Sequence, residues 1–154
     1  MSQPIKTISV PHLGGCDVGF RLSSGSADTS KPTLVLINPF TVTADYYLPE
    51  FSNKALTDSL NLLAIEPLGH GQTRTKKTDS FTYWDSAIVF LQVLDALGID
   101  KAFALGTSQG GWIATRMALV APERVSSVIF EGHRNYYSKI YWALCLTTDY
   151  KKYD

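Results

Sequence analysis

Short apolar runs alternate with helical patterns along most of the chain. Four of these runs contain almost only apolar side chains, which is typical of strands buried on both faces of a parallel sheet. They lie at residues 33–37, 62–65, 102–105 and 125–130. Helical patterns fall between them, and this alternation predicts an α/β fold with a mostly parallel sheet and right-handed crossovers.

The strongest helical pattern covers residues 81–97. Thr82 and Asp85 fit a capping box at its start, and Gly98 stands where a helix of this length would end. Two further helices are predicted at about residues 51–59 and 109–120.

The N-terminal part predicts a different arrangement. Residues 5–10 and 17–22 are rich in strand-forming side chains and flank Gly14 and Gly15, which favours a hairpin of two edge strands. Polar, solvated loops are predicted at residues 23–32 and 72–79.

The turns that follow the four apolar runs carry the residues of greatest chemical interest. In a parallel sheet these turns lie beyond the carboxyl ends of the strands, at one edge. They are residues 38–41, 67–71 and 106–110, with Glu131 after the fourth run. The sequence therefore predicts one crevice shared by all four.

Residues 106–110 read GTSQG and fit the pattern G-x-S-x-G between a predicted strand and a predicted helix. So tight a turn strains the serine backbone, and side chains at Gly106 or Gly110 would collide with the neighbouring strand and helix. Ser108 would stand at a helix N-terminus, where the N–H of Gln109 is placed to stabilise an oxyanion. The alternative is a tight turn in a redox or nucleotide-binding α/β fold.

Over residues 5–132 the chain resembles the first half of an α/β-hydrolase. The resemblance rests on the elbow GTSQGG and on the turns LINPFT and EPLGHGQT. It implies that Ser108 is the nucleophile and that the N–H of Phe40 is the second oxyanion donor. Asn38 and Pro39 stand where the family usually has His-Gly. Proline lacks an N–H, but the implied donor comes one residue later.

A serine nucleophile needs a histidine base and an acid that orients that base. The family places its base in a much later loop, and His133 is the only histidine after Ser108. Glu131 is a candidate acid by the same resemblance; the alternative is a polar residue at a strand end. The resemblance gives His70 a structural role, and His12 is expected on the surface of the hairpin.

Residues 133–154 show no clean period and hold five of the eight tyrosines. We therefore expect residues 1–132 to form the N-terminal half of an α/β-hydrolase domain, with a sheet truncated after about the sixth strand. Residues 133–154 would be an unrelated or aberrant tail, as from a retained intron or a frameshift. On this hypothesis the chain lacks the triad base, is inactive or weak, and has an exposed sheet edge open to self-association.

Composition excludes several classes of protein. Fourteen basic residues balance fourteen acidic ones, which gives no electrostatic argument for nucleic acid or for an anionic membrane. Cys16 and Cys145 are too few for a disulfide framework, and no signal peptide or membrane span is visible, so we expect a cytoplasmic location. No G-x-G-x-x-G, Walker lysine or metal-ligand cluster appears, so no cofactor and no metal is expected.

The expected reaction is hydrolysis of an ester, thioester or lactone of a small molecule. The short N-terminus, the Asn-Pro turn and the Thr-Ser-Gln elbow resemble fungal hydrolases of specialised (secondary) metabolism. The alternative is a non-catalytic truncated paralogue or binding fragment. A haloperoxidase-like activity would keep the fold, whereas a dehalogenase needs a carboxylate at position 108. Phe40 and Trp112 are expected in a pocket wall or the core, and Tyr46 and Tyr47 line a pocket or cap a helix.

Overall fold

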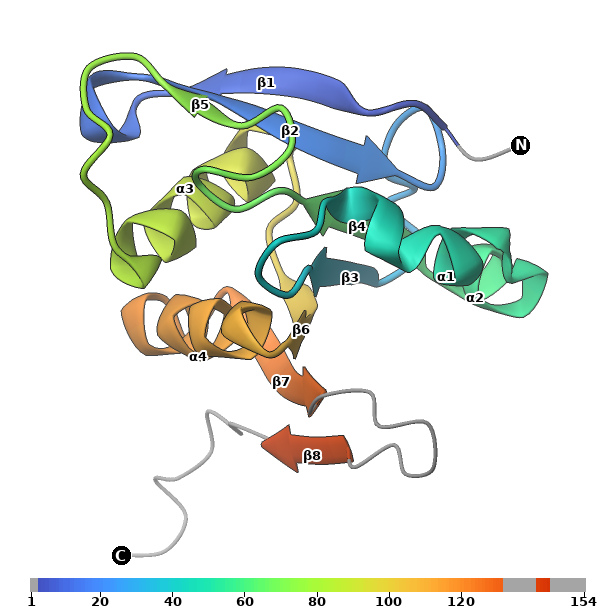
Figure 1. Cartoon of the computed structure of the whole chain (residues 1–154). Coiled ribbons are helices and arrows are strands. Elements are labelled where there is room, and N and C mark those ends of the chain that lie inside the picture. Colours follow the sequence, from blue (N-terminus) through green and yellow to red (C-terminus); the bar gives the residue numbers. More distant parts are fainter. Residues whose placement is uncertain (1–2, 132–140, 145–154) are drawn as a thin grey trace, which may run out of the picture.

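The computed structural model describes residues 3–131 and 141–144. A mixed sheet of eight strands runs through the middle of this part of the molecule, as Figure 1 shows. In chain order the strands are β1 (Lys6–Val10), β2 (Cys16–Leu22), β3 (Thr33–Ile37), β4 (Asn61–Ile65), β5 (Arg74–Thr75), β6 (Ala102–Thr107), β7 (Val125–Glu131) and β8 (Tyr141–Leu144).

The spatial order of the strands is β1-β2-β4-β3-β6-β7-β8, with β5 paired to β2. The central pairs β4–β3, β3–β6 and β6–β7 are parallel. The pairs β1–β2, β2–β4, β2–β5 and β7–β8 are antiparallel. The predicted α/β architecture with a mostly parallel centre is therefore confirmed.

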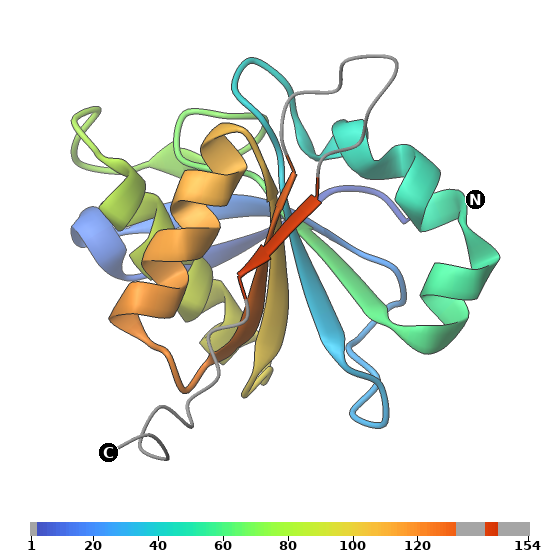
Figure 2. The same ribbon diagram turned by 90° about the horizontal axis from the view of Figure 1, so that it is seen from below.

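Helices cover both faces of the sheet (Figure 2). One face carries α3 (Tyr83–Ala96) and α4 (Gln109–Val120), and the other carries α1 (Leu48–Ser52) and α2 (Lys54–Ser59). Two short 3₁₀ turns, η1 (His12–Gly14) and η2 (Ala44–Tyr47), complete the described elements. The molecule thus has three layers, with the sheet in the middle.

Strand β3 shows why the sheet needs helices on both sides. Val35 and Ile37 point into the larger apolar cluster, which also contains residues of α3 and α4. Leu36 points the other way, into a smaller cluster with Tyr47 and Leu62. Successive side chains of a strand face opposite sides, so a wholly apolar strand needs cover on both faces. Burying each such aliphatic side chain contributes about 1.5–3 kcal/mol.

Several predicted element boundaries are confirmed. Helix α4 begins and ends where its pattern predicts. Thr82 caps α3 in a capping box with Asp85, and Gly98 follows the helix with φ 68°. The predicted strand at residues 33–37 agrees with β3 at both ends.

The structure differs from the sequence analysis in four places. The helix predicted at residues 51–59 is two helices, because Asn53 leaves the helical conformation and caps α2 by accepting from the N–H groups of Ala55 and Leu56. Strand β2 is no edge strand, because it pairs with β4 as well as β1. Neither β5 nor β8 was predicted. Because β8 pairs with β7, the edge of β7 that we expected to be open is occupied.

Candidate active site

Ser108 alone makes the turn from strand β6 to helix α4. Its backbone has φ 53° and ψ −115°, a conformation that side-chain-bearing residues adopt only under strain. Two hydrogen bonds hold it there. The Ser108 N–H donates to the carbonyl of Glu131 at 3.2 Å, and the Ser108 carbonyl accepts from the N–H of Gly111 at 3.0 Å. The turn is thus fastened both to the end of β7 and to the first turn of α4.

Three glycines allow close packing of the chain around Ser108. A Cβ at Gly106 would lie 2.2 Å from the carbonyl carbon of Gly110, and one at Gly110 would lie 2.1 Å from the carbonyl oxygen of Ile37 in β3. A Cβ at Gly111 would lie 2.1 Å from the ring of Phe130. Two of these three clashes involve backbone, which cannot move aside, so the strand-to-helix turn tolerates only glycine at Gly106 and Gly110.

Asn38 fixes the turn that follows β3. Its side chain is buried, and its Nδ2 donates to the carbonyls of Pro39 at 3.1 Å and Val42 at 2.9 Å. Because the peptide group is planar and trans, holding the Pro39 carbonyl toward Asn38 directs the N–H of Phe40 to the opposite side. Thr41 completes the turn with φ 69°. The turn therefore has a defined shape without the His-Gly sequence.

Glu131 lies directly behind the elbow at the end of β7, and its side chain is buried. Its Oε2 accepts from the Thr107 hydroxyl at 2.6 Å, and that hydroxyl lies 3.1 Å from the hydroxyl oxygen of Tyr47. Tyr47 in turn donates to the carbonyl of Ile37 at 2.8 Å. Burial raises the pKa of the Tyr47 hydroxyl far above its ordinary value, so it stays protonated. This buried polar chain joins β3, β6 and β7.

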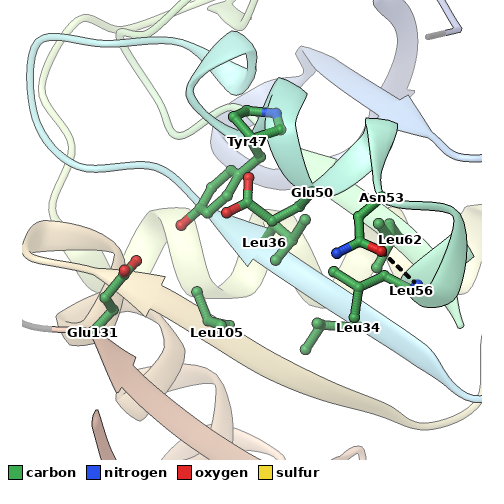
Figure 3. A pocket seen from close by; sticks show the side chains of 10 residues that line it. Leu34, Leu36, Tyr47, Glu50, Asn53, Leu56, Leu62, Leu105 and Glu131 are labelled. Carbon is green, nitrogen blue, oxygen red and sulfur yellow. Dashed lines mark hydrogen bonds between the residues drawn. The ribbon is translucent and has the colours of Figure 1, made fainter. Parts of the chain in front are cut away.

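A cavity of about 340 Å³ opens on the face of the sheet that carries α1 and α2 (Figure 3). We call it the leucine cavity. In Figure 3 the carboxylate of Glu131 enters it from β7, and that of Glu50 from α1. Its lining residues are Leu34, Leu36, Tyr47, Pro49, Glu50, Asn53, Leu56, Leu62, Leu105 and Glu131.

A second cavity, of about 290 Å³, is bordered by the turns after β3 and β4 and by the N-termini of α3 and α4. We call it the aromatic cavity. Phe40 and Gln109, the residues whose N–H groups the sequence suggests as oxyanion donors, both line it. The full lining is Phe40, Pro67, Leu68, His70, Phe81, Thr82, Tyr83, Ser86 and Gln109. Trp112 is exposed and packs edge-on against Phe130 instead.

Both described histidines have a ring nitrogen in contact with a residue other than Ser108. Nδ1 of His70 lies 3.0 Å from the Leu68 carbonyl, so it carries the proton, and its Nε2 then accepts from Nε2 of Gln109 at 2.9 Å. His12 is half-buried, not on the surface as expected, because its Nε2 lies 2.9 Å from Oδ1 of Asp85. His133 lies outside the described residues.

Sequence reasoning missed one buried carboxylate, Glu66. Its two oxygens accept from the backbone N–H groups of Ala44, at 3.2 Å, and Gln72, at 2.6 Å. Both bonds run to segments beside the site, so Glu66 ties the turn after β4 to the segment that follows the turn after β3. The signal was a carboxylate directly after a buried strand, followed by the Gly69 and Gly71 pair.

The described part of the chain holds neither a metal-binding cluster nor a helix that could cross a membrane. No three histidine, cysteine, aspartate or glutamate side chains gather there in a way that could hold a metal ion. None of the helices described has both the length and the apolar character needed to cross a bilayer. Cys16 is buried, and burial raises the pKa of its thiol, which donates to the carbonyl of His12.

Known proteins resemble this chain in sequence. A putative carbamate hydrolase, RutD, from Stutzerimonas stutzeri is 28% identical over 105 residues, which cover 68% of this chain and 39% of the relative. A putative non-heme haloperoxidase from Mycobacterium phage D29 is 29% identical over 111 residues, which cover 72% of this chain and 39% of the relative.

Solved structures resemble it in fold. A carboxylesterase from the thaumarchaeon Nitrososphaera gargenis superposes with a TM-score of 0.72 at 26% identity, covering 83% of this chain and 46% of the other. The chain therefore spans less than half the length of these three relatives. Residues 32–142 match the family described as alpha/beta hydrolase fold. That match takes in β3, the elbow and β7, and the chain belongs to the alpha/beta hydrolase fold family.

Proposed function

We propose that Ser108 is the nucleophile of a serine hydrolase that acts on an ester, thioester or lactone of a small molecule. The observation that carries the proposal is the strained backbone of Ser108, with φ 53° and ψ −115°, between β6 and α4. Three glycines accommodate that conformation at close backbone approach. Backbone strain of this kind costs about 1–3 kcal/mol of stability. Strained residues therefore cluster at functional sites, where the conformation is part of the mechanism. The hydrolases among the relatives support the reaction class.

The oxyanion would be held by the N–H groups of Gln109 and Phe40. Gln109 is the first residue of α4, so its N–H belongs to the positive end of the helix. Asn38 holds the Pro39 carbonyl, which orients the Phe40 peptide group. Both donors would act on one carbonyl oxygen because β3 and β6 are adjacent, parallel strands.

Neither of the two described histidines is assigned as the general base of this site. His70 and His12 both have other hydrogen-bond partners, so we assign neither of them to Ser108. Glu131 is the proposed acid, because its backbone already bonds Ser108 and its side chain borders the leucine cavity. Without a histidine base the chain by itself would hydrolyse its substrate slowly, since a general base contributes about 10²–10⁴-fold.

A fluorophosphonate probe tests the nucleophile. We expect labelling of Ser108 to be about 10²–10⁴-fold slower than that of the active serine of an intact relative treated alongside. Added imidazole should accelerate the labelling by acting as a proton acceptor. Mass spectrometry of the labelled peptide locates the adduct, and Ser108→Ala should abolish it.

Three results would contradict the proposal in different ways. An adduct on another residue, or equal labelling of Ser108→Ala, would remove Ser108 from its role. Labelling as fast as that of the intact relative would show that the chain has a working base. No adduct on folded protein, even with imidazole, would favour the alternative of a non-catalytic binding fragment. The leucine cavity would then be the candidate binding site. A link to specialised metabolism and self-association through a sheet edge stay predictions.

A further inference from the structure

The aromatic cavity begins at the proposed oxyanion site. Phe40 and Gln109, whose N–H groups would bind the carbonyl oxygen, are also two of its lining residues. One of the two groups attached to the carbonyl carbon of a bound ester, on the acyl side or on the alcohol side, would therefore enter this cavity. Its volume of about 290 Å³ is about twice the ~150 Å³ of a cavity that holds one benzene ring.

The lining of the cavity is neutral. None of its nine residues is an aspartate, glutamate, lysine or arginine. Its polar side chains are the hydroxyl-bearing Thr82, Tyr83 and Ser86, together with a pair that is already hydrogen-bonded, since Gln109 donates from Nε2 to Nε2 of His70 at 2.9 Å. A charged group placed here would lose its hydration and find no opposite charge on the lining, which is strongly unfavourable. The cavity therefore selects for an uncharged group.

Four of the nine lining residues carry aromatic rings, and each of these rings contacts another part of the protein. The ring of Phe40 packs edge-on against the His70 ring, with centroids 5.6 Å apart. The guanidinium of Arg116 on α4 lies 5.8 Å from the centroid of the Tyr83 ring on α3. Phe81 leans on the turn after β4, where a Cβ at Gly69 would lie 3.0 Å from its Cζ. Rings presented at fixed edges favour another ring over a flexible alkyl chain.

We propose that the aromatic cavity binds one of the two groups on the carbonyl carbon of the substrate, and that this group is uncharged and bears an aromatic ring. The placement of the cavity next to the carbonyl carbon rests on the proposed nucleophile and oxyanion site. The preference for a neutral aromatic ring rests on the cavity alone.

Binding to the Ser108→Ala variant tests the proposal, because this variant binds without reacting. Methyl phenylacetate is titrated into ¹⁵N-labelled protein and followed by two-dimensional NMR, with a Kd expected on the order of 1 mM for so small a ligand. The amide signals of Gly69 and Ser86 should shift, and that of Gly98 should not.

Two substitutions of equal exposure locate the site. Phe81 and Phe103 are each 38% exposed, but only Phe81 lines the cavity. In the Ser108→Ala background, Phe81→Ala should weaken binding about tenfold and Phe103→Ala should leave it unchanged. Equal effects of the two substitutions, or shifts at Gly98 in place of Gly69, would overturn the proposal.

Two further ligands test the class of the group. Methyl cyclohexylacetate keeps the shape without the aromatic ring, and we expect it to bind several-fold more weakly. Methyl 4-carboxyphenylacetate carries a negative charge on the ring, and we expect at least tenfold weaker binding. Equal binding of either one overturns that part of the proposal. Since none of these measurements needs the nucleophile, a failure of fluorophosphonate labelling and a failure of the cavity are distinguishable.

Discussion

Glu66 and Glu131 are both buried carboxylates at the carboxyl ends of strands in one sheet, yet their surroundings differ. Glu66 accepts from two backbone N–H groups, and its carboxylate leaves no space for a Cβ at Gly19 or Gly71. Glu131 accepts from the hydroxyl of Thr107 and borders the leucine cavity. Glu66 therefore ties two backbone segments together and serves the fold, whereas Glu131 bonds a side chain and borders a cavity.

The largest effect is expected from Gly71→Ala. The new Cβ would lie 2.1 Å from the carboxylate of Glu66, at a φ of 50° that disfavours alanine. We expect a loss of about 3 kcal/mol or more in the free energy of unfolding, measured by urea denaturation. Gly98→Ala is the control, because Gly98 has φ 68° with no atom within 4 Å of the added Cβ. It should lose about 1–2 kcal/mol, and equal losses would show that the space around Glu66 is not the cause.

The second prediction compares the two carboxylates directly. Glu66→Gln places an amide NH₂ against a backbone N–H of Ala44 or Gln72, so we expect a loss of about 2 kcal/mol. Glu131→Gln keeps an oxygen that accepts from Thr107, so we expect a smaller loss than for Glu66→Gln. Chemical denaturation of both variants at one pH gives the difference. Losses in the reverse order would refute the distinction between them.

The third prediction concerns the hydrogen-bonded side chains of Glu131, Thr107 and Tyr47, and it uses the substitution Thr107→Val. The change keeps the shape of the side chain but removes the hydroxyl that donates to Glu131 and contacts Tyr47. We expect a loss of about 1–2 kcal/mol in unfolding free energy. Thr115→Val on α4 removes a half-buried hydroxyl that bonds only a carbonyl of its own helix, and should change stability by less than about 0.5 kcal/mol. Equal losses of unfolding free energy in the two variants would show that the hydrogen bonds around Glu131 add nothing to stability.

The smallest effect concerns a third carboxylate, Asp85, which is partly exposed. Burial raises its pKa, but hydrogen bonds from Thr82 and His12 outweigh this and hold the pKa below its usual 3.8. A carboxylate with a lowered pKa stabilises the fold above the pKa of the unfolded chain, and that contribution fades as pH falls through the folded value. Between about pH 5 and pH 2 we expect the native protein to lose more stability than Asp85→Asn, by under about 1 kcal/mol. Thermal melts of both proteins across this pH range measure the difference. Equal losses of stability in the native protein and in Asp85→Asn would contradict the prediction.

Much of the fold could be predicted because its signals are local. The GTSQG spacing indicates a tight strand-to-helix turn, and in the structure Ser108 forms that turn. The Thr82 capping box and Gly98 also act within one helix. Strands β5 and β8 were missed because such short strands carry no period of their own and form through pairing. Asn53 was missed as a break because its amide competes for the N–H groups of α2 only once α1 has ended.

The surroundings of the candidate site were much less predictable. The bonds between Gln109 and His70, between Glu66 and Ala44, and between His12 and Asp85 each join residues far apart in the sequence. The pattern of apolar and polar residues along the sequence does not predict such long-range hydrogen bonds. The aromatic cavity likewise exists only where the turns after β3 and β4 meet the starts of two helices. The sequence indicates which turns converge, and packing decides what each side chain touches.

The position of β6 between β3 and β7 has a consequence for the order of events during synthesis. Strand β3 has one neighbour, β4, until β6 emerges, because β6 begins only at Ala102. At about 5–20 residues per second on the ribosome, the edge of β3 waits for several seconds with its peptide groups unpaired. The elbow and the turn after β3 are brought together by that same pairing. A nascent chain therefore brings the two turns of the proposed oxyanion site together only when β6 pairs with β3.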